Sequence, residues 1–198
     1  MKVRLLYTLI AIILLLSSCR AGYQMETGKW VYVTYDEGAG RRVRKLEVDH
    51  KNFEVFGNGN YGRDKKNVFY KGGIIEGANP QTFVVLSENG YAKDDKYLYL
   101  EYYIIPLANP KTFEVLKVPY SRDDKKAFCG SIPMQVNDIK SFKVTESSKH
   151  LITRPLRHFI RENPDFKWMD TLGVAGIIYG KGRARTETES FLDFKKIG

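Results

Sequence analysis

A phenylalanine returns every 29 or 30 residues through the middle of this 198-residue chain, at Phe53, Phe83, Phe113 and Phe142. The residues around it return too, because Ala78-Asn79-Pro80-Gln81-Thr82-Phe83 matches Ala108-Asn109-Pro110-Lys111-Thr112-Phe113. Such a period is typical of supersecondary units that bury a core only when they stack on one another. We therefore expect a short repeat array. One apolar run and two cysteines exclude a polytopic membrane protein and a disulfide-dense scaffold.

Each copy also contains an aromatic residue, then Lys or Arg, then an aspartate, at Asp64, Asp94 and Asp123. Asp followed by lysines favours a turn, and the aromatic and β-branched residues that follow favour a hairpin. Asn79-Pro80 predicts a second turn before the strand-like run 82–86. The predicted fold class is mostly β: stacked β-hairpin repeats of about 30 residues with short helical turns, and an irregular C-terminal α/β cap.

The repeats set the expected boundaries. Residues 29–145 form the β-rich repeat module, with units near 29–60, 61–90, 91–119 and 120–145. Residues 19–28 are polar and predict a tether, and residues 146–198 are assigned to a C-terminal cap with a short helix near 155–162.

Three of the hairpins differ in sequence. Glu101-Tyr102-Tyr103 replaces Lys71-Gly72-Gly73, which predicts a different or longer turn, and Pro133 predicts an edge strand or bulge. We expect the last hairpin, at 120–133, to be the least regular.

This combination of motifs resembles the DKNYY family of bacterial repeat proteins. The aromatic, Lys/Arg-Asp, hairpin and Ala-Asn-Pro-x-Thr-Phe elements carry the resemblance over residues 48–145, about half of the chain. It implies a repeat architecture and, because members are often lipoproteins, a lipid anchor. It implies no established catalytic activity.

The N-terminus predicts how the protein is targeted. Lys2 and Arg4 precede the apolar run 5–16, and Leu16-Ser17-Ser18-Cys19 resembles the bacterial lipobox. Residues 1–18 are therefore a predicted lipoprotein signal peptide. Cys19 becomes the lipidated first residue, carrying acyl chains such as palmitate that anchor the protein in a membrane. The alternative is an ordinary signal peptide with Cys19 nearby by chance.

These features predict a lipid-anchored protein of the cell envelope. Arg20 follows the cysteine in place of an aspartate, which favours the outer membrane if the source has two membranes.

Candidate chemistry is sparse. The Asp turns are interpreted as structural caps rather than Ca²⁺ ligands, because lysines follow them closely. His50, His150 and His158 lack metal-ligand spacing, and Cys129 is interpreted as a small buried residue. We predict no catalytic residue, cofactor or metal. Residues 180–185 are glycine-rich and basic but lack the phosphate-loop ending, so a basic loop is favoured.

The chain is basic, with a formal net charge of +9. Basic residues cluster at 41–45 and 181–185. An envelope location argues against nucleic acid as the partner, and leaves contact with anionic headgroups and simple solubility as equal alternatives.

The functional hypothesis is a non-catalytic binding or surface-display module for an envelope protein or glycan. The expected contact residues are four tyrosines, Tyr97, Tyr99, Tyr102 and Tyr103. Two alternatives stay open: the tyrosines pack between units, or the protein is an envelope hydrolase with a site in the C-terminal region.

Overall fold

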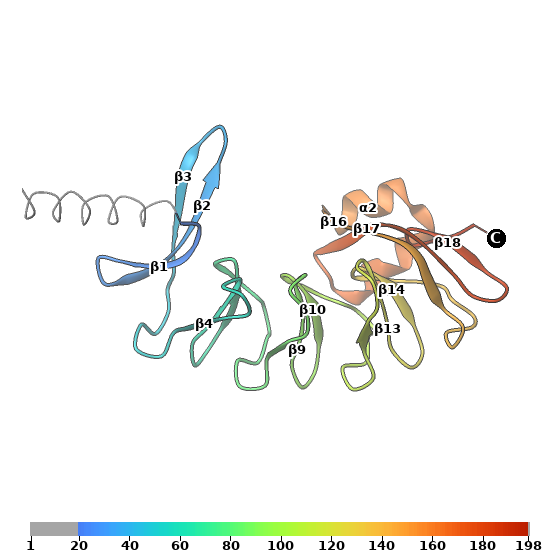
Figure 1. The fold of residues 1–198 in the computed structure, drawn as a ribbon, viewed down its shortest axis with the longest axis horizontal. Helices are drawn as coiled ribbons and strands as arrows, with labels where there is room; N and C mark the ends of the chain where they lie inside the picture. The colour runs from blue at the N-terminus through green and yellow to red at the C-terminus, as the bar shows by residue number, and fades with distance from the viewer. Residues whose placement is uncertain (1–19, 198) are drawn as a thin grey trace, which may run out of the picture.

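The computed structural model describes residues 20–197, and five small antiparallel sheets follow one another along the chain (Figure 1). The first sheet contains β1 (Gly22–Glu26), β2 (Lys29–Asp36) and β3 (Gly40–Lys45), and its β2–β3 hairpin projects from the row of sheets. β1 corrects the predicted tether at 19–28. Tyr23 pairs with Tyr32 and its ring contacts Phe53, so this segment belongs to the fold.

Three sheets of identical layout form the middle of the array. Each has four strands in sequence order, and the strands are β4 (Glu54–Phe56), β5 (Tyr61–Arg63), β6 (Val68–Tyr70), β7 (Gly73–Ile74), β8 (Val84–Val85), β9 (Tyr91–Lys93), β10 (Leu98–Leu100), β11 (Tyr103–Ile104), β12 (Glu114–Val115), β13 (Tyr120–Arg122), β14 (Ala127–Cys129) and β15 (Ile132–Pro133). The first strand of each sheet comes from the tail of one sequence repeat, and the other three come from the next. The structural unit therefore begins about seven residues before each predicted unit boundary near 61, 91 and 120.

The hairpin turns are more alike than the sequence predicts. Leu100 pairs with Tyr103 as Tyr70 pairs with Gly73, so the turn at Glu101-Tyr102 is not longer. Glu101 adopts a φ of 55° without being glycine, like Lys71 at 45°. The expectation that the last hairpin is the least regular is also wrong, because Cys129 pairs with Ile132 in the same register. Pro133 lies in the edge strand β15, as predicted.

A fourth copy of the repeated sheet lies at the C-terminus. It contains β16 (Lys143–Pro155), β17 (Gly176–Arg185), β18 (Ser190–Leu192) and β19 (Lys195–Lys196). Val144 pairs with Ala184 as Val85 pairs with Ala92. The amide of Asp193 donates to Gly182 O, as Glu101 N donates to Gly90 O. The region 146–198 is therefore not simply a cap, because the repeat resumes after an insertion.

The insertion supplies the helices. It contains α2 (Leu156–Glu162), which confirms the predicted helix, and the 3₁₀ helix η1 (Pro164–Leu172). Leu156, Phe159 and Met169 are buried in the core cluster that also holds Tyr120 and Phe142 of the repeats. None of the helices in residues 20–197 is long and apolar enough to cross a membrane.

One tyrosine per sheet joins each sheet to the next. Tyr61 donates its hydroxyl to Gly90 O at 2.9 Å, and Tyr91 donates to Pro119 O at 2.9 Å. Tyr120 continues the series by donating to Asp193 O in the fourth sheet at 3.0 Å. All three side chains are buried, and each lies in a different core cluster, so these hydrogen bonds connect neighbouring clusters.

Candidate functional site

The aspartates of the repeats cap turns, as predicted. One carboxylate oxygen of Asp94 accepts from the amides of Lys96 and Tyr97 at 2.8 and 2.7 Å. The other oxygen accepts from Asn79 N and from the hydroxyl of Tyr99. Asp94 thereby closes its own turn and holds the Asn-Pro turn that precedes its sheet. Asp64 and Asp123 make the same backbone contacts, which are those of Asp64 with Lys66, Asn67 and Asp49 and those of Asp123 with Lys125, Lys126 and Asn109.

Within residues 20–197 there is no group of three or more His, Cys, Asp and Glu side chains placed to hold a metal ion. His50 and His150 are exposed and His158 is half-buried. Cys129 is fully buried, which raises the pKa of its thiol to about 12. Cys19 and the predicted signal peptide 1–18 lie outside the described residues.

The four predicted contact tyrosines do not share one surface. Tyr99 is fully buried and donates to Asp94, so its assignment as a contact residue is wrong. Tyr102 and Tyr103 are half-buried, and Tyr102 packs edge-to-face on Tyr70 of the preceding sheet. Tyr97 is 44% exposed. All three residues of β10 are buried, including Tyr99, whereas Tyr97 and Tyr102 lie in the turns on either side of that strand.

The two basic clusters also differ from expectation. Arg41 pairs with Glu26, and Arg42 lies 3.6 Å from Asp36, so part of the charge on β3 is neutralised. Residues 180–185 are not a loop, because they form the C-terminal half of β17. Their side chains alternate across the strand, with Ala184 buried between exposed Arg183 and Arg185.

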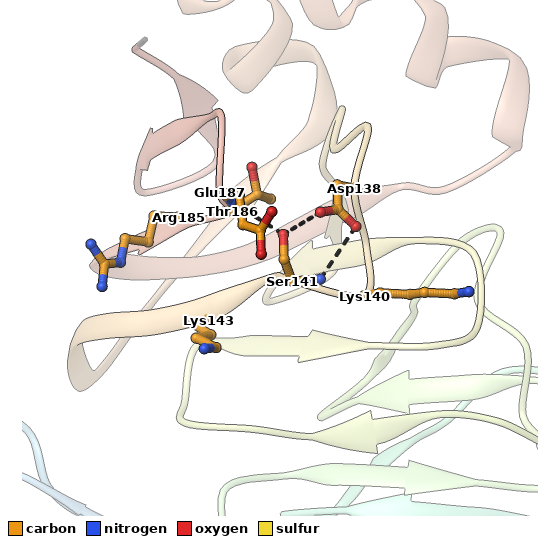
Figure 2. Close-up of a pocket in the computed structure, with 7 residues that line it drawn as sticks. All are labelled: Asp138, Lys140, Ser141, Lys143, Arg185, Thr186 and Glu187. Carbon is orange, nitrogen blue, oxygen red and sulfur yellow. Dashed lines mark hydrogen bonds between the residues drawn. The ribbon is translucent and has the colours of Figure 1, made fainter.

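A cavity of about 620 Å³ opens beside this end of β17 (Figure 2). Its lining residues come from the turn before β16, from the ends of β16 and β17, and from the turn after β17, and they are Asp138, Lys140, Ser141, Lys143, Arg185, Thr186 and Glu187. Figure 2 shows Arg185 and Lys143 on one side of Ser141, with Lys140 extending to the other side. Two strands of the fourth sheet therefore bring two cations to one wall.

The register makes this pair unusual. Lys143 on β16 is the direct cross-strand partner of Arg185 on β17. The equivalent pairs in the first and third repeated sheets are ion pairs, Glu54 with Arg63 and Glu114 with Arg122. Like charges placed directly opposite each other destabilise an antiparallel pair. The fourth sheet thus has two cations where the first and third repeated sheets have a cation and an acid and the second has a cation and a valine.

Arg185 also lacks a contact that two of its equivalents, Arg63 and Lys93, make. Arg63 donates to Pro80 O at 3.1 Å and Lys93 donates to Pro110 O at 3.0 Å, each to the Asn-Pro turn of the following sheet. No repeated sheet follows the fourth among residues 20–197, and neither Arg185 nor Lys143 forms an ion pair or side-chain hydrogen bond there. Their charges face solvent and the cavity.

The two acids on the cavity wall differ in the hydrogen bonds that their carboxylates accept. Asp138 accepts from both the amide and the hydroxyl of Ser141. These hydrogen bonds, the side-chain one foremost, hold the pKa of Asp138 below its usual range. Glu187 donates its amide to Ser141 Oγ, while its carboxylate is exposed and forms no ion pair with a described residue. Asp138 therefore keeps its negative charge while hydrogen-bonded, and the Glu187 carboxylate is the lining acid that bonds to no described side chain.

Sequence reasoning missed Ser141, Lys143 and the isolation of Arg185. The available signal was the alignment of the decayed tail 136–144 with its better copies, which places Lys143 at the position of Glu114. Its partner was hidden, because 39 residues lie between Val144 and Ala184 where only six lie between Val85 and Ala92.

Comparison with known proteins agrees with the repeat architecture. The family model described as DKNYY family matches residues 19–158. No curated protein and no solved structure matched the chain. The match covers more than half of the chain, including the first sheet, all three regular repeated sheets and the start of the fourth. This protein therefore belongs to the DKNYY family.

Proposed function

We propose that this protein is a cell-envelope lipoprotein whose repeat array is a non-catalytic binding module. The lipobox-like sequence ending in Cys19 supports the anchor, and the cavity beside Lys143 and Arg185 supports the binding role. One observation carries the proposal. Each regular sheet has a cation at the position of Arg185, and there it bonds to a carbonyl or a carboxylate of the protein. Among the described repeated sheets, the fourth alone leaves this cation unpaired, beside the cavity.

The polar groups of the array otherwise hold the sheets together. The Asp carboxylates cap turns, the tyrosine hydroxyls reach the next sheet, and Thr82 and Thr112 bind the acids after the capping aspartates. Groups committed to such contacts are not available for a partner. The lysine and arginine of the fourth sheet are available, which favours an anionic envelope component as the ligand.

The same comparison weighs against the hydrolase alternative. Ser141 lies among acids in the C-terminal region, where a hydrolytic site was considered. Its hydroxyl accepts from Glu187 N, as the hydroxyl of Thr82 accepts from Asp95 N. Ser141 therefore has the linking role of a threonine in the regular sheets, and no histidine lines the cavity to act as its base.

The anchor is tested with Cys19→Ala, with Cys129→Ala as the matched thiol control. Detergent phase partitioning of cell extracts should move the Cys19 variant into the aqueous phase and leave the control in the detergent phase. An unchanged mass and unchanged partitioning of the Cys19 variant would rule the anchor out.

The binding role is tested with the full chain as bait in envelope extract. Arg185→Ala should lose the retained component, whereas Arg122→Ala, which changes the equivalent residue of the third sheet, should keep it. Equal retention by both variants contradicts the proposed site. Hydrolysis of an envelope substrate that requires Ser141 would contradict the non-catalytic assignment.

A further inference from the structure

We propose that the wall formed by Lys143 and Arg185 is a phosphate-binding site. This inference rests on the proposed binding function and names the chemistry of its ligand. It concerns the phosphate group itself, whether it is free, carried by a soluble polymer or part of a lipid headgroup.

Lys143 and Arg185 are opposed cations on adjacent strands and repel each other. The first and third repeated sheets place an acid opposite the cation, and the second places Val84 opposite Lys93. A bound anion between Lys143 and Arg185 supplies the missing negative charge from outside the chain. The ligand then takes the place that Glu114 occupies beside Arg122.

Arg185 and Lys143 are hydrogen-bond donors of different shape. Arg185 presents a planar guanidinium that matches two oxygens of one anion, while the Lys143 ammonium acts as a point charge. A phosphate has enough acceptor oxygens to contact both cations at once. Both side chains are exposed, line the same cavity and come from directly paired positions of adjacent strands, so a phosphate entering the cavity meets both cations (Figure 2).

Asp138 and Glu187 are the acids that line the cavity, and both oppose a bound phosphate. Asp138 also holds Ser141, so Glu187 is the acid whose carboxylate can be neutralised without breaking a hydrogen bond, and its neutralisation should strengthen phosphate binding. Lys140 lies on the other side of Ser141 and contributes to the general positive field rather than to the pair. Glu187→Gln therefore removes one opposing charge without removing a cation.

The test uses the full chain in a nonionic detergent, titrated calorimetrically with inorganic phosphate at constant ionic strength. The key variant is Lys143→Glu, which builds the acid–cation pair of the first and third repeated sheets into the fourth. It should weaken phosphate binding by at least about tenfold while raising the thermal midpoint, so loss of folding does not explain loss of binding. Glu187→Gln should tighten binding, and Glu114→Gln at the equivalent ion pair should leave it unchanged.

A second arm separates the sources of phosphate. Vesicles of phosphatidylglycerol in phosphatidylcholine compete with inorganic phosphate if the site accepts a lipid headgroup, whereas a soluble polyphosphate competes if it accepts a polymer. Phosphate binding that is unaffected by Lys143→Glu overturns the inference. If wild-type protein binds no phosphate but its envelope retention still depends on Arg185, the phosphate inference fails and the binding function stands. If both are absent, both fail.

Discussion

The capping aspartates show how much one side chain contributes to this fold. Asp94 is almost fully buried and accepts four hydrogen bonds, from two amides of its own turn, from one amide of the preceding Asn-Pro turn and from Tyr99. Burial by itself raises the pKa of Asp94, but the hydrogen bonds outweigh it and hold the pKa below the usual range. The pKa of Asp64 is lowered by the same balance of causes.

A lowered carboxyl pKa ties stability to pH. In the unfolded chain Asp titrates near about pH 4, so these carboxylates stabilise the fold above that pH, and the contribution is lost as the pH falls through the lower folded-state pKa. The free energy of unfolding, measured by urea denaturation, should therefore fall from pH 5 to pH 2.5. Asp94→Asn should cost about 2 kcal/mol at pH 7 and flatten part of this slope. Asp170→Asn, an exposed control, should do neither.

Among the described glycines, Gly130 is the one where an added Cβ would meet its nearest backbone neighbour at the shortest distance. It has a φ of 62°, and a Cβ there would lie 2.1 Å from Ile178 O on β17. Gly77 has a φ of 75° with nothing within 4 Å of its Cβ position. Gly77→Ala should therefore cost only the backbone term of about 1–2 kcal/mol. Gly130→Ala should cost at least about 2 kcal/mol more in the same denaturation experiment, and equal costs would show that β17 moves aside freely.

At the scale of single residues, turn chemistry was predictable and burial was less so. Asp64 and Asn79 carry local signals, because their side chains bond to backbone groups two or three residues away. Tyr99 lies in a three-residue strand that is buried on both faces. Burial of this kind depends on packing between neighbouring sheets, which the sequence of one short strand does not report, so a buried tyrosine was assigned to the surface.

The four-stranded sheets are individually too small to be stable, since each consists of strands of two or three residues in its regular form. They persist because a buried tyrosine in each sheet bonds to the next. The hydroxyl of Tyr91 crosses from the second repeated sheet to Pro119 O, beside the turn of the third. Cooperation between neighbouring sheets therefore depends on a few hydrogen bonds and on packing between adjacent core clusters.

Removing one of these hydroxyls isolates its contribution. Tyr91→Phe keeps the buried ring and leaves Pro119 O without this donor, so it should cost about 1 kcal/mol of unfolding free energy. Tyr97→Phe, at a 44% exposed side chain, should be neutral within about 0.5 kcal/mol. Native-state hydrogen exchange should show the Tyr91 variant opening first between the second and third repeated sheets. Uniform loss of protection would contradict the linking role.

Most strands and hairpins were predictable from the sequence. The fourth hairpin was not, and its sequence explains why. The hairpins at 61–75, 91–105 and 120–134 all start with an aromatic residue and an aspartate. In the fourth hairpin Arg183 replaces the aromatic residue and Thr186 replaces the aspartate. Thr186 still caps the turn with its hydroxyl, because a threonine oxygen accepts the same amides. The fourth hairpin therefore keeps the turn geometry of the others although it lacks their aromatic residue and aspartate. The cavity beside it was missed because the hairpin was not recognised in the sequence.

The molecule is a row of sheets in chain order, and the largest core cluster of the described residues lies at its C-terminal end. The core cluster of the fourth sheet joins Tyr120 and Cys129 of the third sheet to Phe159 and Phe166 of the insertion. Ser131, in the turn of the third sheet, donates its amide to Ile178 O at 2.7 Å and accepts from Ile178 N. The C-terminal segment is thus the end on which the regular sheets depend.

This arrangement predicts the result of ending the chain at residue 145, where the recognisable sequence repeat stops. The shortened chain keeps three regular sheets but loses β17, the partner of Ser131, and most of the cluster around Tyr120 and Phe142. Terminal repeats need a covered outer face, so we expect it to lose its cooperative thermal transition and to bind a hydrophobic dye. The control is the full-length chain carrying Ile197→Ala, an exposed position, which should keep a sharp transition. If the chain ending at 145 unfolds with the midpoint of the full protein, the regular sheets are self-sufficient and the fourth sheet serves the ligand alone.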